Sequence, residues 1–300
     1  MANEVDNHGQ VYKKPSVGAC IGGFLVGSVA NIAISGVVSN VAGLSGGDAL
    51  KKMDNTLTAD EFSSIDKAIN KTLDSSGLSK KGVSIIKATS KNIEEVDNIV
   101  YNEMNSDFFT KNLYPKFLKK NISKSLADAI RNGKNALHAK FPNKLIFSAK
   151  GPTLPAFHEV GHALNYTLGS FSKMLRSSRS AALLLIPITW IALLKNKKAP
   201  NQEPSGAVDK TTTFIKNNAG KLAFLAFVPA MLEEGIASFK GNKIAKQLLK
   251  PELAKKVAKT NIIGFLTYLA LAIGAGLGIY TGTKVRDSIA KPKLVTQEKN

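Results

Sequence analysis

Residues 16–44 read SVGACIGGFLVGSVANIAISGVVSNVAGL, and no side chain among them is charged. A helix needs about 20 apolar residues to cross a bilayer, so this segment is long enough to span a membrane. It is too long and too glycine-rich for the apolar part of a cleaved signal peptide, and we expect it to be retained. Residues 261–283 are also uncharged. The sequence therefore predicts a membrane helix near each end of the chain, with buried core helices as the alternative.

Glycines in these two segments recur at four-residue spacing, which permits close contact between membrane helices. The pairs are Gly18 and Gly22, Gly23 and Gly27, and Gly274 and Gly278.

The balance of charge indicates which partners to expect. The net charge is +19, and lysines occur in nearly every segment that is not apolar. This favours contact with anionic lipid headgroups. No aromatic-rich basic motif of a nucleic-acid-binding module accompanies the lysines, so we expect no nucleic-acid partner. Cys20 is the only cysteine, which excludes a disulfide within the chain.

Four regions follow from these patterns. Residues 1–45 form a tail and a membrane helix, and residues 46–135 form a polar helical region. Residues 136–260 form a third region, with an apolar hairpin at 180–232, and residues 261–300 form a membrane helix and a tail.

The polar region contains two helix signals. Thr58 and Glu61 form a capping-box pattern, and a second helix over residues 122–130 should end near Gly133. The first helix should bury the apolar residues that follow its cap at helical spacing, namely Phe62, Ile65, Ile69 and Leu73.

A β-hairpin is predicted at the start of the third region, residues 136–260. Two short apolar runs, residues 136–141 and 145–149, are separated by Pro142-Asn143-Lys144. We expect residues 145–149 to form an exposed edge strand that pairs with an extended peptide substrate, with a purely packing hairpin as the alternative. A helix should begin near Ala156, with Pro155 close to its first turn.

Two shorter apolar stretches follow, at residues 180–194 and 222–232. Each is below about 20 residues, so each spans a membrane only by extending into its flanks. The second ends at Glu233 and Glu234, so we expect the helix to leave the lipid there and the site to lie near the membrane surface. The lysine-rich region at residues 46–135 favours a cytoplasmic side for this site.

Residues 157–165 read FHEVGHALN and contain the HExxH pattern. On a helix, His158 and His162 lie one turn apart on one face, so both can bind one tetrahedral zinc ion with Glu159 beside the open position. Bound zinc lowers the pKa of water, and Glu159 can accept the proton as that water attacks a peptide carbonyl. Two surface histidines on an ordinary helix are the alternative.

A third ligand must come from elsewhere. No histidine follows the motif, and only His8 and His138 could supply a third imidazole. This excludes the metzincin arrangement and favours a glutamate on a later helix. The only suitable acidic cluster is Glu233 and Glu234, whose side chains point about 100° apart on a helix, so only one faces the metal. We expect His138 and Tyr166 to be structural, with a substrate or transition-state contact by His138 as the alternative.

HEVGHAL, followed after two apolar stretches by LEEGIAS at residues 232–238, resembles the gluzincins, zinc peptidases whose third ligand is a glutamate on a later helix. The second segment is similar to the glutamate-glycine-aromatic-alanine segment of aminopeptidase N-type enzymes. It is also similar to the ExxA(D/S) segment of the bacterial membrane neutral zinc peptidases and of the prenyl-protein and heat-shock membrane peptidases. Both likenesses imply Glu234 as the ligand. The resemblance covers about residues 145–245, and Ser238 stands where the heat-shock type usually has aspartate.

The sequence therefore predicts a mainly α-helical, multi-pass integral protein of a bacterial cell membrane with a zincin-like catalytic core. The expected activity is a Zn²⁺-dependent endopeptidase, with His158, His162 and Glu234 as ligands and Glu159 as catalytic base. Its expected partners are membrane lipids and protein or peptide substrates at the membrane. The alternatives are a zinc-binding membrane scaffold without turnover and a lysine-rich lipid-binding protein in which HExxH is accidental.

Overall fold

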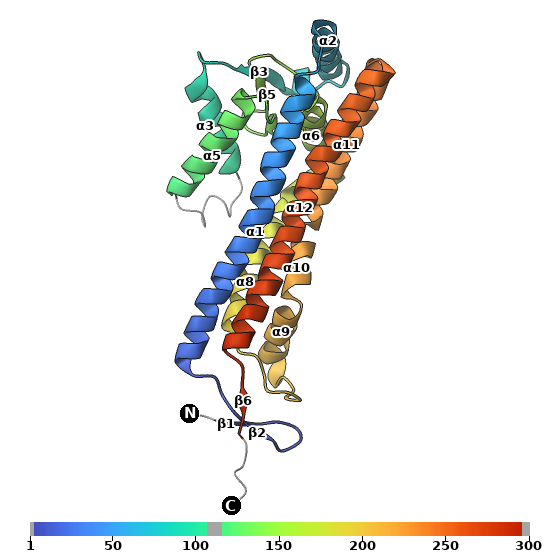
Figure 1. Cartoon of the computed structure of the whole chain (residues 1–300). Helices are drawn as coiled ribbons and strands as arrows, with labels where there is room; N and C mark the ends of the chain where they lie inside the picture. The colour runs from blue at the N-terminus through green and yellow to red at the C-terminus, as the bar shows by residue number, and fades with distance from the viewer. Residues whose placement is uncertain (1–2, 107–115, 296–300) are drawn as a thin grey trace, which may run out of the picture. The chain divides into compact units, whose positions relative to one another are not determined.

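The computed structural model describes residues 3–106 and 116–295, and within them the chain is mainly helical with two small sheets (Figure 1). The helices are α1 (Val17–Asp54), α2 (Ala59–Ser75), α3 (Ile93–Met104), α5 (Lys116–Arg131), α6 (Ala156–Leu168), α7 (Ser170–Ser177), α8 (Leu185–Leu194), α9 (Gly206–Asn217), α10 (Ala219–Ala226), α11 (Val228–Leu248) and α12 (Pro251–Ile289). Short 3-10 helices are η1 (Ser79–Lys81) and η2 (Ser178–Leu184). The strands are β1 (Asn3–Val5), β2 (Val11–Lys13), β3 (Ser84–Ala88), β4 (Leu137–Ala139), β5 (Lys144–Ser148) and β6 (Lys293–Leu294).

In the described part of the chain, three helical runs are long and apolar enough to cross a membrane: Val17–Asp54, Ala219–Leu248 and Pro251–Ile289. The first and third contain the two uncharged segments that we expected to span. The middle run joins α10 to α11 and continues well past Glu233 and Glu234, which lie near its middle. The expectation that the helix leaves the lipid at these glutamates is therefore wrong, because the apolar residues continue on both sides of them. The two arms of the expected apolar hairpin are therefore unequal, because the other apolar helix, Ala181–Leu194, is shorter.

The chain divides into two compact units. The described residues of one unit come from Met1–Asn40, Ala181–Val228 and Ala270–Asn300. Those of the other unit come from Val41–Ser180 and Pro229–Leu269, so the HExxH helix and both glutamates lie in this second unit.

The second unit contains a three-stranded sheet with the order β3-β5-β4. The predicted hairpin is confirmed, since β4 and β5 pair antiparallel with Leu137 opposite Ile146. The expectation that residues 145–149 form an edge strand is wrong, because β5 also pairs in parallel with β3. β3 itself lies in the region that we expected to be helical. Its run between Gly82 and Ser90 is too short for a helix, and pairing with β5 partly buries it.

Helices cover both faces of this sheet. Residues alternate along β5, so Leu145 and Phe147 pack in a cluster with α2 and α6, whereas Ile146 packs with α3 and α5. The capping box at Thr58 and Glu61 is confirmed. Three of the four residues that we expected α2 to bury are buried in the first cluster, namely Ile65, Ile69 and Leu73. α6 is thus held between α2 and the sheet.

In the first unit, α1 and α12 approach through glycines. A Cβ on Gly27 would lie 2.6 Å from the carbonyl oxygen of Gly282, and one on Gly278 would lie 2.8 Å from that of Asn31. These short distances confirm the close helix contact that the four-residue spacing predicted for the pairs Gly23 and Gly27, and Gly274 and Gly278. A Cβ on Gly18 or Gly22 would meet nothing within 4 Å, so the first pair has no such contact among the described residues.

Candidate metal centre

The HExxH motif lies on α6, as predicted, and its two histidines face each other. The Nε2 atoms of His158 and His162 are 2.9 Å apart, because residues four apart on a helix share a face. Both rings are largely shielded from solvent, with His158 the more exposed side chain at 15% and His162 at 7%. Access to the pair is therefore from the side of His158.

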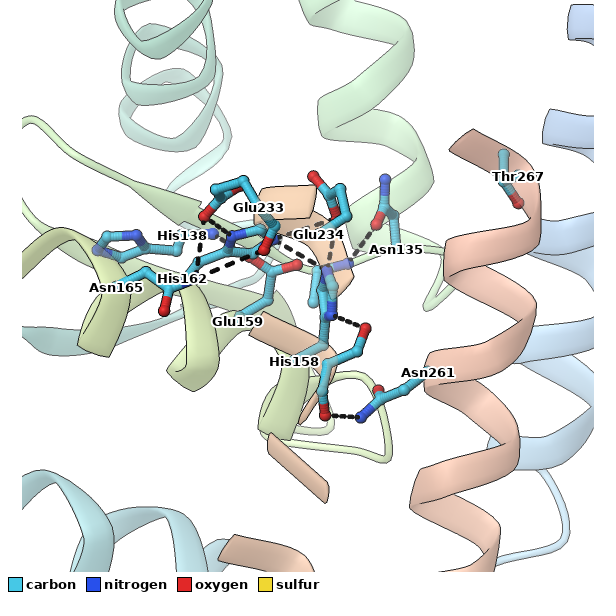
Figure 2. A network of polar contacts seen from close by, with 12 residues as sticks. Asn135, His138, His158, Glu159, His162, Asn165, Glu233, Glu234, Asn261 and Thr267 are labelled. Carbon is cyan, nitrogen blue, oxygen red and sulfur yellow. Dashed lines mark hydrogen bonds and ion pairs between the residues drawn. The ribbon is translucent and has the colours of Figure 1, made fainter. Parts of the chain in front are cut away.

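Glu234 on α11 completes a group of three. Its Oε2 atom lies 2.9 Å from Nε2 of His158 and 3.4 Å from Nε2 of His162 (Figure 2). These three side chains could hold a metal ion, and they form the only such group of histidine, cysteine and acidic residues found among the described residues. The structure thus brings together the three residues that we expected as ligands.

Two glycines let α6 and α11 come this close. A Cβ on Gly161, inside the motif, would lie 2.1 Å from the carbonyl oxygen of Ala237. A Cβ on Gly241 would lie 2.5 Å from the carbonyl oxygen of Phe157. Each helix therefore needs a glycine where it meets the backbone of the other. Glu234 reaches the histidines because no side chain separates the two helices at these points.

The donor atoms fit a small divalent cation. Tetrahedral zinc at bond lengths of about 2.0–2.1 Å places its ligand atoms about 3.3–3.4 Å apart. The three observed separations are 2.9, 2.9 and 3.4 Å, so only small shifts are needed. Imidazole nitrogens and a carboxylate oxygen are ligands that zinc accepts, and the same set also suits Fe²⁺.

A second layer of side chains holds the two rings. Nδ1 of His162 lies 2.8 Å from Oε1 of Glu233, which is fully buried, and Nδ2 of Asn165 donates to the same oxygen at 3.2 Å. Nδ1 of His158 lies 3.0 Å from the hydroxyl of Ser238. Groups that bond the distal nitrogen of a metal-binding histidine fix its tautomer and orientation.

No sequence pattern had assigned these side chains to a second layer. Glu233 was considered only as an alternative ligand, yet it contacts Nδ1 of His162 and not the Nε2 atom that faces Glu234. Asn165 and Ser238 were given no role. Helical spacing offered a signal, because Asn165 lies three residues after His162 and Ser238 lies four after Glu234, each on the same helix face.

Glu159 lies beside the three-atom group and is not part of it. Its Oε2 accepts a hydrogen bond of 2.6 Å from the backbone N–H of His138. Burial raises the pKa of Glu159 above its ordinary value, against the opposing effect of His162 and His158. Burial alone would lower the pKa of His162, but the carboxylates of Glu234 and Glu233 outweigh it and raise that pKa to about 10.

His138 contacts both the hairpin turn and Tyr166. The His138 ring is 1% exposed, and its Nε2 lies 3.0 Å from Oδ1 of Asn143 in the hairpin turn. Tyr166 lies against it with ring centres 6.2 Å apart. Neither His138 nor His8 belongs to the candidate metal group described above.

No model of a known protein family matches the sequence, and searches of curated proteins and of solved structures returned no match.

Proposed function

We propose that this protein is a membrane-embedded zinc endopeptidase of the gluzincin type, with a zincin-like core, that cleaves membrane or membrane-proximal proteins. One observation carries the proposal: the two histidines of HExxH meet a glutamate from a separate helix, while the motif glutamate stays outside the ligand group. An accidental HExxH gives no reason for a glutamate 76 residues away to lie 2.9 Å from its first histidine.

The side chains then have distinct tasks. His158, His162 and Glu234 hold the ion, which when bound polarises a water molecule and lowers its pKa. Glu159 takes the proton from that water and passes it to the leaving amine. Its raised pKa suits this task, because a general base works best when its pKa is near the working pH.

An extended substrate has a strand to pair with. β4 is an edge of the sheet and lies against α6. The N–H of His138 on β4 points away from β5 and donates to Glu159, so this edge of β4 borders the proposed catalytic carboxylate. The N–H of Lys140, just beyond β4, donates to Glu103, so a peptide that pairs along this edge must replace these two hydrogen bonds. A peptide added along this edge would place its backbone beside Glu159. β4 thus takes the role that we had expected of residues 145–149.

The position of Glu234 supports a membrane substrate. Glu233 and Glu234 lie inside the candidate span Ala219–Leu248, and both are fully buried in the protein. Ionisable groups at membrane depth are costly, and they generally mark functional sites. Proteins that reach such a site are those that already lie in or on the bilayer.

The substitution Glu159→Gln tests this function. In liposomes with membrane-protein substrates, the variant should cleave about 10²-fold to 10⁴-fold more slowly than wild type while keeping its zinc. Elemental analysis of both proteins gives the metal content and separates zinc from iron. Equal cleavage by both would assign the activity to a contaminant. Zinc binding without cleavage of any substrate would favour the scaffold without turnover.

A further inference from the structure

The first unit contains a polar pocket and an apolar groove that the proposed peptidase site does not use. The pocket, of about 240 Å³, is lined by Lys216, Lys284 and Asp287 among others. The groove, of about 530 Å³, lies between α10 and α12. Gly220 and Tyr280 line both, so pocket and groove adjoin.

The groove is apolar and lies on two helical runs that are suited to a membrane. Its walls include Leu225 and Leu277, whose side chains are 57% and 49% exposed. Its floor is made by two glycines, because a Cβ on Gly220 would lie 2.8 Å from the carbonyl oxygen of Gly276. α10 and α12 are in backbone contact at these two glycines, and neither glycine has a side chain to fill the space beside the contact. The volume is within the range of about 300–1,000 Å³ that is usual for ligand sites.

The pocket end of this hollow has an excess of positive charge. Lys216 is 5% exposed and donates to Asp287 at 2.5 Å, and Arg286 binds the same carboxylate at 3.0 Å. The single carboxylate of Asp287 is thus shared by two buried cations, Lys216 and Arg286. Lys284 in the pocket and Lys221 in the groove are exposed, and no carboxylate pairs with either of them among the described residues.

These charges lie where the apolar segments end. Lys284 directly follows the uncharged residues 261–283, and its Nζ lies 5.4 Å from the centre of the Tyr280 ring. Lys221 precedes the apolar part of α10. Lysine and tyrosine at the end of an apolar helix are typical of the membrane–water interface. Basic pockets between membrane helices at this level bind acidic headgroups.

We propose that this pocket and groove bind one anionic phospholipid, with its phosphate between Lys221 and Lys284 and an acyl chain along Leu225 and Leu277. A free phosphate would use only the polar pocket. The adjoining apolar groove is what selects a lipid.

Native mass spectrometry of the purified protein tests the headgroup contact. After incubation with equal amounts of long-chain phosphatidylglycerol and phosphatidylcholine, wild type should retain about tenfold more phosphatidylglycerol. Lys221→Gln/Lys284→Gln should lose this preference. The control Lys124→Gln/Lys259→Gln removes two exposed lysines of the other unit and should keep it. Equal loss in both double variants, or in neither, would overturn the proposal.

The acyl contact is tested on wild type alone. Long-chain phosphatidylglycerol should be retained, whereas dihexanoyl phosphatidylglycerol and inorganic phosphate at the same concentration should fail to displace it. Displacement by inorganic phosphate would show an anion pocket without a lipid, and would also overturn the proposal.

Discussion

Replacing Gly161 with alanine tests whether the close approach of α6 and α11 makes the metal site. The added Cβ would lie 2.1 Å from the carbonyl oxygen of Ala237. Ordinary contact begins at 3.4 Å, so the two helices must separate locally by about 1.3 Å. A backbone carbonyl cannot rotate away as a side chain can. The strain therefore acts on the spacing between the helix that carries the histidines and the helix that carries Glu234.

This displacement exceeds what a zinc site tolerates. Glu234 Oε2 lies 2.9 and 3.4 Å from the two Nε2 atoms, and a further 1.3 Å would open these separations to about 4.2 and 4.7 Å. Tetrahedral ligands stand about 3.3–3.4 Å apart, and metal–ligand distances vary by only about 0.2 Å. Structural sites with four ligands bind zinc with roughly 10–16 kcal/mol. Losing one ligand thus costs roughly 3 kcal/mol, on the order of 10²-fold in affinity.

Competition with a chelating dye measures that affinity on purified protein, and circular dichroism checks that helix content is unchanged. Gly264→Ala is the matched control, because its Cβ would meet nothing within 4 Å and it lies in the same unit. The control should bind zinc within about threefold of wild type, as surface substitutions of this kind change little. Zinc binding by Gly161→Ala as tight as that of Gly264→Ala would refute the role assigned to the helix contact.

Glu234→Gln should lower zinc affinity on the order of 10²-fold, whereas Glu233→Gln should lower it about tenfold, since Glu233 contacts Nδ1 of His162 and lies outside the candidate ligand group. The reverse order in chelator competition would make Glu233 the ligand. Ser238→Ala removes the hydroxyl that contacts Nδ1 of His158, and it should lower zinc affinity about tenfold. Unchanged zinc affinity would show that this hydroxyl does not orient the ring. The pKa of His162 is raised to about 10, so its imidazole is protonated below that pH and must lose a proton before it can bind zinc. Zinc affinity should therefore rise about tenfold per pH unit up to about pH 10. Titration calorimetry in buffers of different ionisation enthalpy counts the released proton, and a count of zero would contradict this prediction.

Local signals predicted much of the second unit. Thr58 and Glu61 identified the start of α2 because a capping box needs only residues three apart, and the motif predicted a helix because two metal-binding histidines four apart need one. The hairpin was likewise a local pattern. Each of these depends on neighbours in the sequence, so each could be found without the fold.

The errors concern contacts between distant segments. β3 pairs with β5 across 60 residues. The sequence of Ser84–Ala88 does not indicate which strand is its partner, so the prediction that β5 is an edge strand is wrong. The contacts of Gly161 and Gly241 were equally hidden, because a glycine does not reveal whether it serves a turn or a helix contact. Glu234 could be separated from Glu233 only by resemblance, whereas the structure separates them by the nitrogen of His162 that each one faces.

The buried charges give a reason for a cation that is independent of the motif. Glu159, Glu233 and Glu234 are each under a tenth exposed, and the described ion pairs of the latter two are with His158 and His162. Buried carboxylates need compensating charge, since leaving one unpaired costs several kcal/mol. Protonated histidines can supply that charge but cannot then bind metal through the same nitrogen. A divalent ion removes this conflict, because it takes the proton's place between His162 and Glu234 and adds a second positive charge. Glu159 stays outside this ligand group, so its carboxylate can accept a proton.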